Sequence, residues 1–131
     1  MAMVSSLAAR SARAGVWHTP TITVDALTQG EVQQIRVSRE LGLVSPGMRE
    51  FFEDGFYHGF TSDVAARERT NHATMMRSIR DAGGRLLVGT DAGFGWIIPG
   101  YSIHDEIGGF VDGGFTPADA DRKSTRLNSS H

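Results

Sequence analysis

Two stretches of the chain share the same order of helix end, glycine and short apolar run. The first is ARAG followed by VWHTPTITV, and the second is IRDAGG followed by RLLVGTDAG. Glycine is the usual residue at the C-terminal end of a helix, and β-branched or aliphatic runs favour strands. The pattern therefore predicts strands at residues 16–24 and 85–90. Because a helix end precedes each run, the order favours α/β units with parallel strands.

The region between these runs predicts helices. Asp25 is placed to cap a helix that continues to about Leu41, and Pro46 with Gly47 interrupts the helical pattern. A longer helix is expected over residues 62–83, since a serine and an aspartate can cap its start and a glycine stops its end. After the second strand we expect a glycine-rich loop and then two short helices.

Composition narrows the class of protein. The chain has 131 residues, is 40% hydrophobic and carries a net charge of -2. This length fits one ordinary domain, and the negative charge argues against nucleic-acid binding. No apolar run is long enough to span a membrane, and the absence of cysteine excludes disulfides and thiolate metal ligands. We expect a cytoplasmic protein that acts on a small-molecule substrate.

Asp91 is the strongest candidate for chemistry. It follows the apolar run LLVGT, at the expected carboxyl end of a strand, which is the catalytic face of α/β barrels. A buried carboxylate needs a counter-charge, which a metal ion can supply. A purely structural aspartate, which accepts hydrogen bonds from backbone N–H groups of its own loop, is the alternative. The residue pattern alone leaves both interpretations open.

Several strings resemble the closing part of one enzyme family. GGRLLVGTDAG, residues 83–93, and PGYSIHDEIGGFVDGGFTPADA, residues 99–120, resemble the C-terminal segment of metal-dependent amidohydrolases of the imidazolonepropionase and prolidase-like branch. GVWHTPTITV, residues 15–24, resembles an earlier strand of the same family. The resemblance implies an α/β fold, a (β/α)8 TIM barrel of which this chain would contain the last two strands and their helices.

The resemblance also implies a role for Asp91 as a metal ligand that accepts a proton from the attacking water. A divalent metal, here expected to be zinc, lowers the pKa of water, and a nearby carboxylate passes the proton to the leaving nitrogen. His18, Tyr101 and His104 are further candidates for contact with substrate. A lone histidine is more often structural, and His104 could instead steady the loop after Asp91. The parent enzyme would hydrolyse C–N bonds in cyclic amides, imidazolones or dipeptide-like substrates.

The departures from the family pattern concern the other metal ligands. The paired His-x-His, the later histidine ligands and the bridging lysine of the family have no counterpart, because the only lysine is Lys123. A metal site needs at least three protein ligands. We therefore expect a C-terminal fragment that is inactive and binds no metal tightly, with homo-oligomerisation of the parent left open. The alternatives are another metal-dependent barrel hydrolase, such as a phosphoesterase or deaminase, or a non-catalytic α/β binding module.

The last residues differ from the rest of the chain. Residues 121–131, DRKSTRLNSSH, are polar and non-periodic, and they resemble the translation of a sequencing-adapter oligonucleotide. We expect a non-native, disordered tail after a domain that covers residues 1–120. A natural disordered C-terminus is the alternative, because polar chain ends are commonly unstructured.

Overall fold

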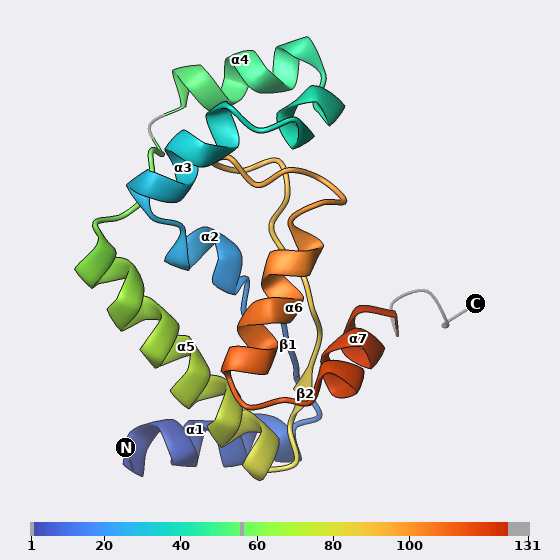
Figure 1. The fold of residues 1–131 in the computed structure, drawn as a ribbon. Coiled ribbons are helices and arrows are strands. Elements are labelled where there is room, and N and C mark those ends of the chain that lie inside the picture. Colours follow the sequence, from blue (N-terminus) through green and yellow to red (C-terminus); the bar gives the residue numbers. More distant parts are fainter. Residues whose placement is uncertain (1, 56, 126–131) are drawn as a thin grey trace.

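The computed structural model describes residues 2–55 and 57–125 (Figure 1). Helices surround one short pair of parallel strands, and α5 and α6 diverge from each other with α2 between them. The helices are α1 (Ala2–Arg13), α2 (Ile22–Ala26), α3 (Gln29–Arg36), α4 (Pro46–Asp54), α5 (Ser62–Asp81), α6 (Ile103–Asp112) and α7 (Pro117–Thr125), and a 3-10 helix, η1, covers Glu40–Leu43. The strands are β1 (Trp17–His18) and β2 (Arg85–Leu86).

The expectation of a partial (β/α)8 barrel is wrong. β1 and β2 do pair in parallel, with Trp17 opposite Arg85, but each strand has 2 residues. They are the only strands in the described part of the chain, which is 61% helical. The regular alternation of strands and helices that a barrel requires is therefore missing.

The first expected strand ends early because a distant side chain stabilises a helix in its place. The run TITV is β-branched, yet it begins α2 after Thr21, whose φ is 50°. The Glu106 carboxylate accepts hydrogen bonds from the N–H groups of Ile22, at 3.0 Å, and Thr23, at 2.8 Å. These are donors of the first turn, which have no partner inside the helix. This tertiary contact outweighs the β propensity of the run.

Residues 25–41 do not form the single helix that the pattern predicts. Asp25 lies inside α2, and α3 begins only after Thr28. The Thr28 hydroxyl accepts a hydrogen bond from Glu31 N–H, and the Glu31 carboxylate accepts one from Thr28 N–H at 2.7 Å. This reciprocal capping box fixes the start of α3 locally.

The two ends of the segment that contains α3 and α4 lie next to each other and are joined by backbone hydrogen bonds. Gln29 N–H donates to Phe60 O at 2.9 Å, and Phe60 N–H donates to Leu27 O at 2.8 Å. Gly59 has a φ of 83°, and a Cβ there would lie 2.6 Å from the carbonyl carbon of Thr28. Only glycine fits so close a crossing of two backbones.

Apolar side chains form two clusters. The first lies between α2, α5, β2 and α6 and includes Leu86 and Phe110. The second joins α2, α3 and α4 to the loop after β2 and includes Val32, Phe52 and Trp96. Trp96 is fully buried, with its ring centroid 5.6 Å from that of Phe52. The second cluster therefore holds the loop after β2 against α4.

The end of the chain continues as helix beyond Ala120. α7 reaches Thr125, so it includes the start of the expected tail, whereas residues 126–131 lie outside the described residues. Among the helices of the described part, none combines the length and the apolar character needed to cross a bilayer.

Candidate functional site

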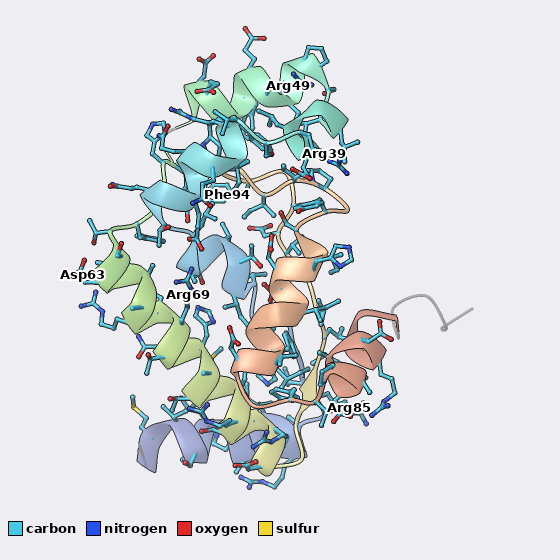
Figure 2. All side chains as sticks on the ribbon, in the orientation of Figure 1. Arg39, Arg49, Asp63, Arg69, Arg85 and Phe94 are labelled. Atoms are coloured by element: carbon cyan, nitrogen blue, oxygen red, sulfur yellow. The ribbon has the colours of Figure 1, made fainter. Side chains whose placement is uncertain are left out.

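Asp91 lies on an exposed turn on the carboxyl side of β2. Its φ of 54° is uncommon for a residue other than glycine. Its carbonyl oxygen accepts a hydrogen bond from Phe94 N–H at 3.2 Å, and the Phe94 ring, labelled in Figure 2, packs against that of Tyr57 near the end of α4. The Asp91 carboxylate makes no hydrogen bond or ion pair with the residues that the structure describes. The turn therefore presents an uncommitted carboxylate to solvent.

The segments that follow β1 and β2 stay side by side. Leu87 N–H donates to His18 O at 2.8 Å. A Cβ on Gly89 would lie 2.6 Å from the Cγ2 atom of Thr19, so a side chain at residue 89 would push against the Thr19 side chain. Asp91 consequently lies at the carboxyl end of the strand pair, on the same side as the residues that follow β1.

The structure does not bring the other predicted site residues to Asp91. The Nε2 atom of His18 lies 3.0 Å from Ser11 Oγ of α1, an interaction that ties the strand to the first helix. Tyr101 and His104 form an edge-to-face ring pair with centroids 6.3 Å apart, at one end of a groove. Within the described residues no group of three or more histidine and carboxylate side chains could hold a metal ion.

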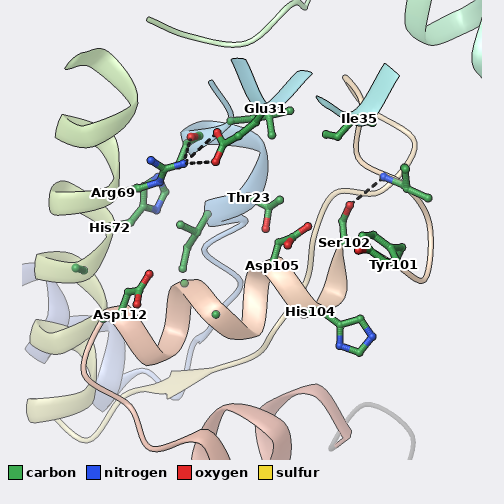
Figure 3. Close-up of a pocket in the computed structure, with 18 of the residues that line it drawn as sticks. Thr23, Glu31, Ile35, Arg69, His72, Tyr101, Ser102, His104, Asp105 and Asp112 are labelled. Atoms are coloured by element: carbon green, nitrogen blue, oxygen red, sulfur yellow. Dashed lines mark hydrogen bonds and ion pairs between the residues drawn. The ribbon is translucent and has the colours of Figure 1, made fainter. Parts of the chain in front are cut away.

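The groove has a volume of about 980 Å³ and lies between α5 and α6, with α2 and α3 contributing to its walls (Figure 3). α5 supplies Arg69 and Arg77, and α6 supplies Asp105 and Asp112. Neither Asp91 nor His18 is among the described residues that line it. The groove is therefore a second candidate site, distinct from the Asp91 turn.

The charges at the α3 end of the groove are partly compensated. Arg69 Nη2 donates to Glu31 Oε1 at 3.0 Å and to Ala26 O at 2.9 Å. Burial opposes ionisation of Glu31, but hydrogen bonds from Thr28 and the charge of Arg69 hold the pKa of Glu31 below its usual value. Burial and the negative charge of Glu31 raise the pKa of Asp105, although His104 acts in the opposite direction. Asp105 thus lacks the compensation that Glu31 has.

Glu106 is a buried carboxylate whose structural role the sequence pattern did not reveal. It is fully buried and also accepts a hydrogen bond from the Thr23 hydroxyl at 2.8 Å. Burial raises the pKa of Glu106 more than its hydrogen-bond donors and the nearby His72 lower it. Ser102, one turn earlier, accepts a hydrogen bond from Ile98 N–H at 3.0 Å. The available signal was their spacing of four residues, which places both on one face of a helix.

His72, on α5, lines the groove between α5 and α6. Its Nε2 atom lies 3.2 Å from the Asp25 carboxylate, while its Nδ1 atom is buried without a hydrogen-bond partner in the described residues. This contact depends on the meeting of α2 and α5, which sequence spacing does not reveal.

Comparisons with models of protein families, with curated proteins and with solved structures give no match to this chain.

Proposed function

We propose that this chain is the C-terminal part of a metal-dependent hydrolase of C–N bonds and that Asp91 is its contribution to the active site. The single observation that carries the proposal is the uncommitted, exposed carboxylate of Asp91 on a left-handed backbone. Such a conformation costs on the order of 1–3 kcal/mol for a residue with a side chain and is concentrated at functional sites. The resemblance of the GTDAG string to amidohydrolases supports the choice of reaction.

The chain by itself does not fit a divalent metal. The described residues contain no cluster of three ligands, and a catalytic metal site combines at least three with an open position. The other ligands would belong to the parent protein. The role proposed for Asp91 is to accept a proton from the attacking water and to donate it to the leaving nitrogen. The Asp91 carboxylate is exposed, and no group among the described residues donates a hydrogen bond to it, so it is available to accept this proton.

The test uses the full-length parent, cloned from the genomic locus. We expect it to contain a divalent metal, measured by elemental analysis, and to hydrolyse members of a panel of N-acyl amino acids, cyclic amides and dipeptides. Asp91→Asn keeps the size of the side chain but removes its basicity, so kcat should fall by about 10²-fold or more. The matched control Asp54→Asn, at an exposed position on α4, should keep the parental activity.

Two outcomes would contradict the proposal. One is a parent that contains no metal and hydrolyses none of these substrates. The other is an active parent in which Asp91→Asn has the same kcat and the same metal content as the unmodified protein. For the chain of 131 residues alone, we expect no turnover and no change in melting temperature on addition of zinc.

A further inference from the structure

One face of α6 carries a stripe of acidic and small residues along the groove. Asp105, Gly108, Gly109 and Asp112 lie at positions i, i+3, i+4 and i+7, and all of them line the groove. Asp105 and Asp112 point into the space that α2 and α5 enclose (Figure 3). A Cβ on Gly108 would meet no atom within 4 Å, so the helix surface is open at this position, whereas a Cβ on Gly109 would lie 3.0 Å from Ile22 Cδ1. The open space along α6 therefore lies over Gly108, and Ile22 closes the groove beside Gly109.

The facing wall, on α5, is basic. Arg69 and Arg77 lie two turns apart with the small Ala73 between them. Arg69 is occupied by Glu31 and a backbone carbonyl. The Arg77 guanidinium makes one long hydrogen bond, at 3.4 Å to Thr74 Oγ1, and no ion pair with the residues described. Arg77 therefore keeps most of its donors for an anion.

The opposite charges of the two walls do not neutralise each other. Within the described residues no ion pair joins α5 to α6 across the groove. Asp105 and Asp112 accept no side-chain hydrogen bond there, and burial and Glu31 raise the pKa of Asp105. A ligand that brought a positive charge to α6 and a negative charge to α5 would compensate both walls.

We propose that this groove binds a small zwitterion of the amino-acid type, with its ammonium group on the acidic wall of α6 that carries Asp105 and Asp112 and its carboxylate at Arg77. A simple cation would leave Arg77 without a partner, and a simple anion would face two carboxylates. The base of the groove is apolar, with Ile22 and Ala26, and suits a short aliphatic body. Its volume of about 980 Å³ lies within the range of ligand pockets.

Calorimetric titration of the full chain tests the charge requirement. The probes are zwitterions of increasing charge separation, namely glycine, 4-aminobutanoate and 6-aminohexanoate, and the single-charge controls butylamine and butyrate. We expect at least one zwitterion to bind saturably, with a Kd about tenfold or more below that of either control. Saturable binding of butylamine with equal affinity, or the absence of saturable binding by every zwitterion, would overturn the proposal.

Substitutions then test the location. Asp112→Asn and Arg77→Gln should each raise the Kd of the best zwitterion about tenfold. Asp81→Asn and Arg67→Gln make the same changes of charge on α5 but outside the groove. They should leave the Kd of that zwitterion within about twofold of its value for the unmodified chain. Circular dichroism verifies folding, and if a groove variant fails to fold, the probe series on the unmodified chain still decides. Equal effects of groove and control variants would refute the site. Asp91→Asn should not change the Kd, which separates this site from the proposed hydrolase function.

Discussion

Replacing Glu106 by alanine tests whether one buried carboxylate holds α2 in place of a strand. Glu106 is 0% exposed and receives its hydrogen bonds from Ile22 N–H, Thr23 N–H and the Thr23 hydroxyl, at 2.8–3.0 Å. Alanine would leave the two backbone donors at the start of α2 without an acceptor and would create a cavity beside them. No other acceptor for these two donors is present among the described residues.

The size of the effect follows from the two orphaned donors. Each buried N–H group left without a partner costs about 1–3 kcal/mol. Part of this loss is offset, because burial raises the pKa of Glu106 and its ionised form therefore carries a desolvation cost. We expect the free energy of unfolding to fall by about 3 kcal/mol, a large share of the 5–15 kcal/mol that is typical of a domain.

Urea unfolding, followed by circular dichroism, measures this difference. Glu106→Gln keeps one acceptor oxygen and should lose about 1–2 kcal/mol, less than the alanine variant. The control Asp105→Ala removes the neighbouring carboxylate, which is only partly buried and accepts no hydrogen bond within the described residues, and should be within about 0.5 kcal/mol of the unmodified chain. If Glu106→Ala were as stable as this control, Glu106 could not be the residue that makes the TITV run helical.

The dependence on pH gives a second test with a definite sign. Because the pKa of Glu106 is raised in the folded state, the folded chain holds this proton more tightly than the unfolded chain, whose glutamates have a pKa of about 4.3. The contribution of this group to stability is fully present below the unfolded pKa and is lost as the pH rises through the folded pKa. The unmodified chain should therefore lose stability relative to Glu106→Gln above about pH 4, and a gain would contradict the raised pKa.

Three further changes test local features. Gly95→Ala should destabilise the chain by about 1–3 kcal/mol, since a Cβ there would lie 2.3 Å from Tyr57 Cδ1, and chemical denaturation that shows no loss would disprove this contact. Thr28→Ala removes the cap of α3 and should cost about 1 kcal/mol in the same assay, whereas an unchanged midpoint would argue against the capping box. In a Trp17→Phe variant, the fluorescence of Trp96 should be shielded from acrylamide, because its side chain is fully buried; efficient quenching would contradict the second core cluster.

Asp91 and the groove show how much of the candidate sites the sequence could reveal. Asp91 was identified from its position directly after an apolar run, and the structure places it on an exposed turn after β2. The groove could not be identified in this way. Asp112 and Arg77 lie on different helices, and their facing positions depend on the angle at which α5 and α6 pack. No spacing along the chain encodes that angle.

The sequence by itself determined the elements whose signals are local. The helix expected over residues 62–83 is found as α5, and Gly83 follows it with a φ of 74°. The last helix begins at Pro117, and the Thr116 hydroxyl accepts a hydrogen bond from Asp119 N–H at 3.1 Å. In both cases the residues that start or stop the helix are within one turn of its end, so their chemistry is complete without the rest of the fold.

Only the tertiary structure decided how much of the two β-branched or aliphatic runs forms strand. Their β propensity is a preference worth about 1 kcal/mol, which packing and hydrogen bonds from other segments readily exceed. For the first run, the Glu106 carboxylate, 84 residues away from Ile22, favours a helix. For the second, the loop after Leu86 is held by the burial of Trp96 against Phe52. These contacts exist only once distant segments have met, which is why the local pattern favoured longer strands and the structure has a mostly helical fold with two short ones.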